Sequence, residues 1–161
     1  MDELLTLADN YPRRSVDAGE VLLTDGSPVP ALYVLVEGAL RVEKSGVPIT
    51  TVSEPGACVG EMSLLLDVPA TADVVADTES TVAVVDNAAE RLATDPQLAI
   101  AMARLLAARL HAMTTYLADV KQQYADHEGG LGMVDVVLEQ LLLTAGPRSE
   151  LGSERDPEPE D

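Results

Sequence analysis

The hydrophobic period of the chain changes once, and this change limits the folds that the chain can adopt. From Val16 to about Asp86, short runs rich in β-branched and aliphatic residues are separated by turn pairs such as Asp-Gly, Ser-Gly and Pro-Gly. Runs of this length and spacing are typical of an all-β barrel or sandwich. From Pro96 to about His127 the chain has no Gly and no further Pro, and its apolar residues recur at helical spacing. The sequence therefore predicts a mainly β domain followed by one long helix.

The barrel is predicted to follow a short helix and to contain several β-rich runs. Residues 2–8, DELLTLA, are expected to form that helix, and the β-rich runs are 21–24, 31–38, 39–44, 47–53 and 73–86. A chain of 161 residues is long enough for one domain with its own core and an attached helix. We therefore expect residues 1–127 to form one domain that includes the long helix of about 96–127.

The long helix carries an apolar seam of heptad type. Its residues alternate at steps of four and three and are Leu106, Leu110, Met113, Leu117, Val120 and Tyr124. Ala99 and Ala103 extend the seam backward, and such small residues would let the helix approach its own barrel or a partner closely. A helix of this length exceeds what one small barrel can cover, so we expect part of the seam to bind a second copy in a homodimer. The alternative is that the seam packs against its own domain throughout.

The residues after the long helix form two segments of different composition. Gly129 and Gly130 are expected to end the long helix, and residues 131–143 then show a short apolar helical pattern. Residues 144–161 are rich in Pro, Ser and acidic residues and contain few apolar ones, so we expect this tail to be disordered.

Charge and aromatic content argue against nucleic acid and membrane partners. The formal net charge is -18, and ten Lys and Arg residues are spread over the whole chain, so a basic face for phosphates is not expected. Without Phe or Trp the chain also lacks a base-stacking platform. An acidic N-terminus without an export signal, a single Cys, and no run of roughly 20 apolar residues together predict a cytoplasmic protein.

The sequence offers little for metal or catalytic chemistry. Cys58 has no companion Cys or His nearby, and His111 and His127 are too far apart to form an i, i+4 metal pair. We expect Cys58 to be a small core residue and His111 to lie on the helix surface or at a dimer contact. No nucleophile elbow, Gly-rich nucleotide loop or paired-carboxylate spacing is found, so neither a metal site nor an enzyme is predicted.

Several ordered motifs resemble one known family. They are Gly19-Glu20-Val21 before Asp25-Gly26, the run from Leu32 to Gly38, Pro55-Gly56, the run from Val59 to Leu65, and Pro69 with Val74. In this order they resemble the cyclic-nucleotide-binding domain of the catabolite-activator and protein-kinase-A regulatory-subunit superfamily, over roughly residues 15–127. The resemblance implies a jelly-roll β-barrel with a short N-terminal helix and a long C-terminal dimerisation helix. It also implies cyclic AMP or cyclic GMP as the ligand class.

By this resemblance the stretch that begins at Gly60 would be the phosphate-binding cassette. Gly60 would let the backbone approach the ligand, and Glu61 would accept a hydrogen bond from the ribose 2′-hydroxyl. The amides near Met62 and Ser63 would face the phosphate, as expected at a helix N-terminus. The alternative for Glu61 is a solvated glutamate in the first turn of a helix. The next two residues, Leu64 and Leu65, are expected to be core rather than ligand wall.

The cassette departs from the family pattern at Ala70, which stands where the family carries its phosphate-pairing arginine. An ionised hydrogen bond of this kind is worth about 1.5 to 3 kcal/mol, so its loss alone would weaken binding by roughly ten- to more than a hundredfold. Thr71 stands where the family often has a hydroxyl or a small residue, and it retains a polar contact.

No nearby residue obviously replaces the arginine in the sequence. Between Lys44 and Arg91 there is no Lys or Arg, and Asp67 and Asp73 add negative charge to the neighbourhood. Arg104 and Arg109 would reach the pocket only from the long helix, from the same or the other subunit.

Two functions therefore remain open at this point. In the first, the protein is a stand-alone sensor, in which a cyclic nucleotide or related small anion shifts the long helix and segment 131–143 and so regulates a separate protein partner. In the second, the pocket is vestigial, and the protein is a constitutive dimeric scaffold whose segment 131–143 docks a partner or packs back onto the barrel. Only 31 residues follow Gly130, fewer than the roughly 50 of the smallest domains, so direct DNA binding is not expected.

Overall fold

The computed structural model describes residues 2–124 and 132–143. Its helices are α1 (Asp2–Ala8), α2 (Glu61–Leu66), α3 (Ala88–Thr94), α4 (Pro96–Gln123) and α5 (Gly132–Leu143). Its strands are β1 (Arg13–Val16), β2 (Val21–Leu23), β3 (Ala31–Glu37), β4 (Leu40–Lys44), β5 (Val47–Val52), β6 (Cys58–Val59), β7 (Asp73–Ala76) and β8 (Ser80–Asp86). The chain divides into two compact units, Met1–Leu106 and Ala107–Asp161, with the boundary inside α4.

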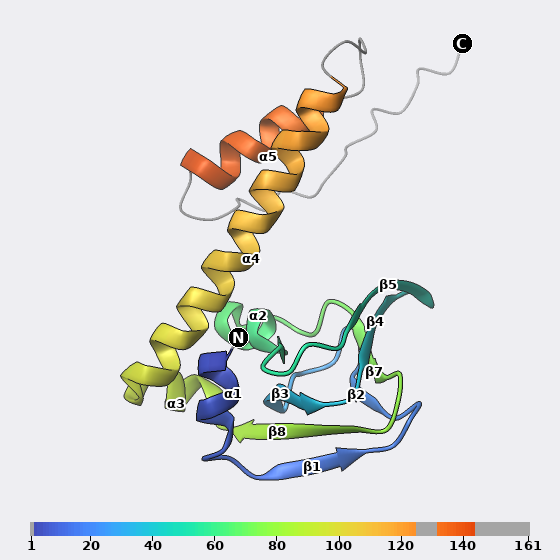
Figure 1. Ribbon diagram of the computed structural model, residues 1–161, viewed down its shortest axis with the longest axis vertical. Coiled ribbons are helices and arrows are strands. Elements are labelled where there is room, and N and C mark those ends of the chain that lie inside the picture. The colour runs from blue at the N-terminus through green and yellow to red at the C-terminus, as the bar shows by residue number, and fades with distance from the viewer. Residues whose placement is uncertain (1, 125–131, 144–161) are drawn as a thin grey trace, which may run out of the picture. The chain divides into compact units, whose positions relative to one another are not determined.

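The first unit contains two antiparallel four-stranded sheets (Figure 1). The strand order is β1-β8-β3-β6 in the first sheet and β2-β7-β4-β5 in the second. Together with the short N-terminal helix and the long helix α4, this arrangement confirms the predicted jelly-roll fold class. Residues 125–131 and the expected acidic tail lie outside the described residues.

Three elements were not expected, and one expected run is divided. Residues 73–86 are two strands rather than one, because the chain turns where the Asp77 amide donates to the Ala39 carbonyl at 2.8 Å. The unexpected elements are β1, β6 and α3. Only Val16 of β1 is buried, and β6 has two residues, so neither presents the alternating pattern by which a strand is predicted.

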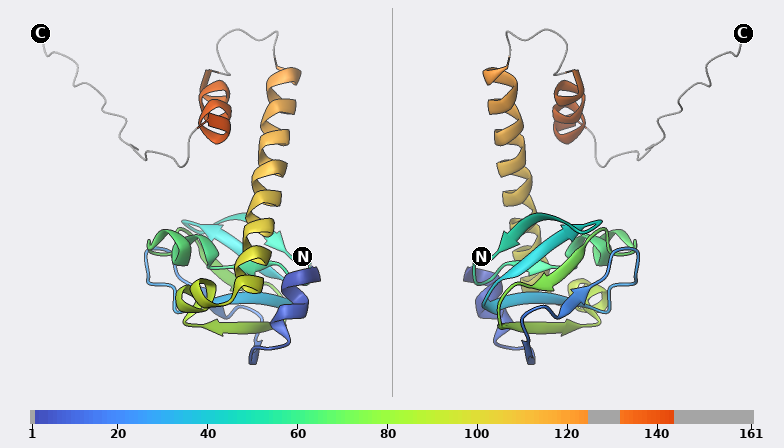
Figure 2. Two further views of the ribbon diagram at one scale, coloured as in Figure 1. Left: turned by 90° about the vertical axis from the view of Figure 1, so that its left-hand side faces the viewer. Right: turned by 90° about the vertical axis from the view of Figure 1, so that its right-hand side faces the viewer.

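The hydrophobic core consists of two clusters on opposite faces of the first sheet. Strand β3 contributes to both because its side chains alternate: Tyr33 and Leu35 face the second sheet, whereas Leu32 and Val34 face the helices. The helical cluster contains residues of α1, α3 and the first turns of α4, which lie on one side of the sheets (Figure 2). Cys58 is fully buried in this cluster, which confirms its assignment as a core residue.

Helix α4 contacts the barrel through a stripe that differs from its heptad seam. The buried residues of the helix are Leu98, Ala101, Met102 and Leu105. Ala103 is exposed, so it does not bring the helix close to its own barrel, and its close approach to a partner stays a prediction. In the second unit, Lys121 of α4 forms an ion pair with Asp135 of α5. None of the helices among the described residues is long and apolar enough to cross a membrane.

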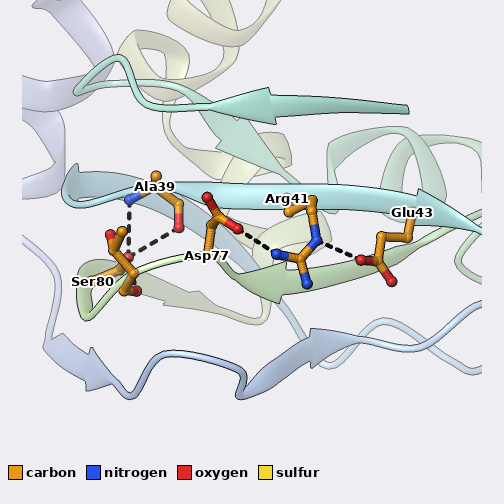
Figure 3. Close-up of polar contacts among 6 residues, drawn as sticks. Ala39, Arg41, Glu43, Asp77 and Ser80 are labelled. Carbon is orange, nitrogen blue, oxygen red and sulfur yellow. Dashed lines mark hydrogen bonds and ion pairs between the residues drawn. The ribbon is translucent and has the colours of Figure 1, made fainter. Parts of the chain in front are cut away.

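The outer face of the second sheet carries a polar network (Figure 3). Arg41 of β4 forms ion pairs with Glu43 of the same strand and with Asp77. The hydrogen bond with Glu43, followed by that with Asp77, raises the pKa of the Arg41 guanidinium above its ordinary value. Beside this network, the Ser80 hydroxyl accepts a hydrogen bond from the Ala39 amide at 3.1 Å. These contacts join β4 to the turn that divides residues 73–86.

Candidate functional site

The cassette begins with a backbone turn that requires glycine. Gly60 follows β6 and has a φ of 92°, in the left-handed region that favours glycine. A Cβ atom at this position would lie 3.1 Å from both the Ala31 carbonyl oxygen and the Val29 side chain. Gly60 therefore lets the chain pass close to β3 and enter α2 directly.

Two polar side chains of helix α2 are buried. Glu61, in its first turn, is only 5% exposed, and Ser63 is also buried. The Ser63 hydroxyl donates a hydrogen bond to the Pro69 carbonyl at 3.3 Å, which closes the cassette on itself. Met62, between them, is exposed. The alternative that Glu61 is a solvated side chain is therefore wrong, because its carboxylate lies inside the fold.

The apolar residues of α2 divide between core and surface. Leu64 is half-buried against the helical core cluster, in line with its predicted core role. Leu65 is 46% exposed, so the prediction that it belongs to the core is wrong. The six-residue helix turns Leu65 away from the sheets, and Leu66 is exposed next to it.

Ala70 lies in the core between the two sheets. Its amide donates to the Ser27 carbonyl at 2.9 Å, and its carbonyl accepts from the Gly26 amide at 2.7 Å. The loop between β2 and β3 therefore holds the end of the cassette through two backbone hydrogen bonds. A side chain at this position starts inside the barrel, whereas Thr71 is exposed.

Lys44, the last residue of β4, reaches the cassette. Its Nζ donates to the Thr71 carbonyl at 2.8 Å and pairs with Asp25 Oδ2 at 2.7 Å. The Asp25 amide in turn donates to Asp73 Oδ1 at 2.7 Å. Sequence reasoning missed this cation because Lys44 is remote in the chain. The signal that places it is the register of β4 and β7, in which Glu43 lies opposite Asp73.

One of the two arginines considered from the long helix, Arg104, has another role in this structure. Arg104 donates from Nη1 to both carboxylate oxygens of Glu3 in α1, at 2.9 and 3.1 Å. This contact ties α4 to the N-terminal helix and leaves Arg104 away from the cassette. His111 is exposed on α4, and no group of three potential metal-ligating side chains occurs among residues 2–124 and 132–143.

The predicted seam of α4 lies largely at the surface of the single chain. Leu110 is 44% exposed, Met113 is 56% exposed and Tyr124 is also exposed. The remaining seam residues are half-buried: Leu106, Leu117 and Val120. Leu106 packs against the helical core cluster, whereas Leu110, Met113 and Tyr124 continue the seam at the surface.

Comparison with known proteins places this geometry in a family. The cyclic nucleotide-binding domain model matches residues 13–91. Acetyltransferase Pat of Mycolicibacterium smegmatis is 36% identical over 73 residues, which are 44% of this chain and 22% of that protein. The cAMP-dependent protein kinase regulatory subunit of Yarrowia lipolytica is 31% identical over 71 residues, which are 44% of this chain and 19% of that protein. The chain therefore spans about a fifth of the length of these two relatives.

A solved structure shows the same fold over a longer stretch. The catabolite activator protein of Thermus thermophilus superimposes with a TM-score of 0.57 and 24% identity, covering 78% of this chain and 59% of that one. Residues 13–91, which the family model matches, contain the Gly60 turn, α2 and strands β1 to β8. Residues 13–91 therefore belong to the cyclic nucleotide-binding domain family, and the chain shares the fold of the catabolite activator protein.

Proposed function

We propose that this protein is a non-enzymatic regulatory module that binds a cyclic nucleotide or a related small anion weakly and acts through a separate protein partner. The observation that carries the proposal is the burial of Glu61 directly after the Gly60 turn. A carboxylate accepts hydrogen bonds through both of its oxygens, so Glu61 places an acceptor for a ribose hydroxyl at the start of the cassette. The names of two similar proteins, a cAMP-dependent kinase regulatory subunit and a catabolite activator, support this ligand class and a regulatory role.

Weak rather than tight binding follows from Ala70. A methyl group at this position cannot pair with a phosphate, whereas the backbone turn and the buried carboxylate are retained. The acetyltransferase relative matches over 22% of its own length, so its activity is not carried over to this chain. Cyclic AMP and cyclic GMP are the ligands to test first.

Replacing Glu61 tests the proposal directly. Glu61→Gln keeps the size of the side chain but removes the charge that accepts the ribose hydrogen bond, so we expect the Kd for cyclic AMP to rise about tenfold. Isothermal titration calorimetry measures this change. Glu54→Gln is the matched control, because Glu54 is exposed in the turn before the cassette and should leave the Kd unchanged. A wild-type protein that gives no heat at millimolar cyclic AMP or cyclic GMP contradicts ligand sensing.

The second function is a ligand-independent dimeric scaffold with a vestigial pocket. The loss of the arginine at Ala70 favours it, and the exposed seam of α4 offers the surface for a homodimer. Leu110 and Met113 are large apolar residues that a single chain leaves in contact with water. Burial of such a seam in a second copy follows the heptad pattern. The dimer is compatible with both functions, and ligand binding distinguishes them.

Truncation of the seam is expected to weaken this dimer. Leu110→Ala removes apolar contact area from both copies, so we expect the dissociation constant to rise about tenfold in sedimentation equilibrium. Ile100→Ala is the control: Ile100 is 48% exposed, much like Leu110, but lies on α4 outside the seam. Equal dissociation constants for the two variants would show that the seam is not the interface.

A further inference from the structure

The side chain of Lys44 points to the inner side of the second sheet. Strand side chains alternate between faces, and Arg41 and Glu43 meet on the outer face (Figure 3). Leu40 and Val42 belong to the core between the sheets. Lys44 is two residues beyond Val42, so its side chain is on the same face of β4 as Leu40 and Val42. It therefore lies at the inner rim of the barrel, where β4 ends.

The ammonium group of Lys44 is anchored beside the position of the missing arginine. Its hydrogen bond to the Thr71 carbonyl places Nζ at the residue that follows Ala70. Ala70 itself is buried between the sheets and contributes only a methyl group. The Lys44 side chain is 50% exposed, so its charge is open to solvent and to a ligand.

We propose that Lys44 supplies the cation that pairs with the phosphodiester of the ligand in this cassette, in place of an arginine at position 70. This inference rests on the proposed function, since it names the group that binds the ligand's charge. Lysine acts as a compact point charge and lacks the two-pronged geometry of a guanidinium. A half-exposed ammonium also gains less from pairing than a buried one, which agrees with weak binding.

Asp25 opposes this binding. Its carboxylate lies 2.7 Å from Lys44 Nζ. A phosphate that pairs with Lys44 must therefore compete with this carboxylate for the ammonium group. The negative charge of Asp25 also repels an anionic ligand. Asp25 therefore acts as an internal competitor for Lys44 and sets how weakly the phosphodiester binds.

Substitutions of Lys44 and Asp25 are expected to change the Kd in opposite directions. This difference distinguishes a role in ligand binding from a purely structural role of the ion pair. Lys44→Gln should raise the Kd for cyclic AMP and cyclic GMP about three- to tenfold in calorimetric titration. Asp25→Asn should lower it about two- to fivefold, because it frees the same ammonium. If the pair merely held the β2–β3 loop, both variants would lose the same contact and both would bind more weakly. That result would overturn the proposal.

Further variants complete the experiment. Lys44→Arg should retain the wild-type Kd within about twofold, since the charge remains. Arg41→Gln removes one positive charge from the outer face of the same strand and should leave the Kd unchanged, provided that urea unfolding shows a folded protein. Wild-type binding that Lys44→Gln leaves unaltered overturns the role of Lys44 alone. Absence of wild-type binding overturns both this role and the proposed ligand sensing.

Discussion

Gly38→Ala is expected to lower the free energy of unfolding by about 3 kcal/mol or more. Gly38 joins β3 to β4 with a φ of 101°, which a residue with a Cβ rarely adopts. A Cβ atom there would also lie 2.2 Å from Ser80 Oγ and 2.7 Å from the Ser80 Cα. The Ser80 side chain cannot move away from the new Cβ atom without breaking its hydrogen bonds to the Ala39 backbone. Equilibrium unfolding in urea, followed by far-ultraviolet circular dichroism, measures the loss.

Gly46→Ala separates the two causes of this loss. Gly46 also has a positive φ, 76°, in the hairpin turn between β4 and β5, but a Cβ atom added there would have no other atom within 4 Å. We expect this variant to lose only about 1 kcal/mol, the cost of the backbone conformation alone. Equal losses for Gly38→Ala and Gly46→Ala would show that the contact with Ser80 contributes nothing.

Ala70→Arg is expected to increase the affinity for cyclic AMP about ten- to a hundredfold. The position starts inside the barrel and is held by backbone hydrogen bonds to Gly26 and Ser27, so a guanidinium there projects into the cassette. Without ligand this charge is partly desolvated, and the variant should unfold at a lower urea concentration than the wild type. Added cyclic AMP should restore the midpoint, because a ligand that binds only the folded state stabilises it.

Val68→Arg is the control for charge alone. Val68 lies in the same cassette but is exposed, so an arginine there adds the same charge outside the barrel. We expect at most a twofold change in Kd from this variant, as for a screened surface charge. If Ala70→Arg binds no better than Val68→Arg, the cassette has lost more than its cation, and the scaffold function gains support.

The architecture could be predicted from the sequence because the turn residues and the hydrophobic patterns indicate the same elements. The turn residues Ser45 and Gly46 both have positive φ and connect β4 to β5 where the hairpin was expected. The short helix at residues 2–8 and the long helix from Pro96 likewise follow their patterns. Such elements are predictable because their own residues determine them.

Other features depend on partners remote in the chain and escaped sequence reasoning. Strand β1 is held by its ladder with β8, although its first residues, Arg13 and Arg14, are exposed. The contact of Lys44 with Thr71 exists only because β4 and β7 pair in one particular register. Leu65 was misplaced because an apolar residue next to a core position need not be buried. The position of the cassette could thus be predicted from the sequence, but the charged side chains around it could not.

The aromatic composition of the protein also provides an intrinsic spectroscopic probe of the cassette. The chain has no Trp and no Phe, and of its four tyrosines only Tyr33 is fully enclosed. Tyr33 pairs across the sheet with Val59, the residue immediately before the Gly60 turn. We expect its phenol ring to contribute to the near-ultraviolet dichroism that rigid packing produces, together with Tyr11, which packs against Arg91. A rearrangement of the cassette that moves Val59 against Tyr33 is therefore expected to change this signal in the native protein, without a dye, a tag or an added fluorophore.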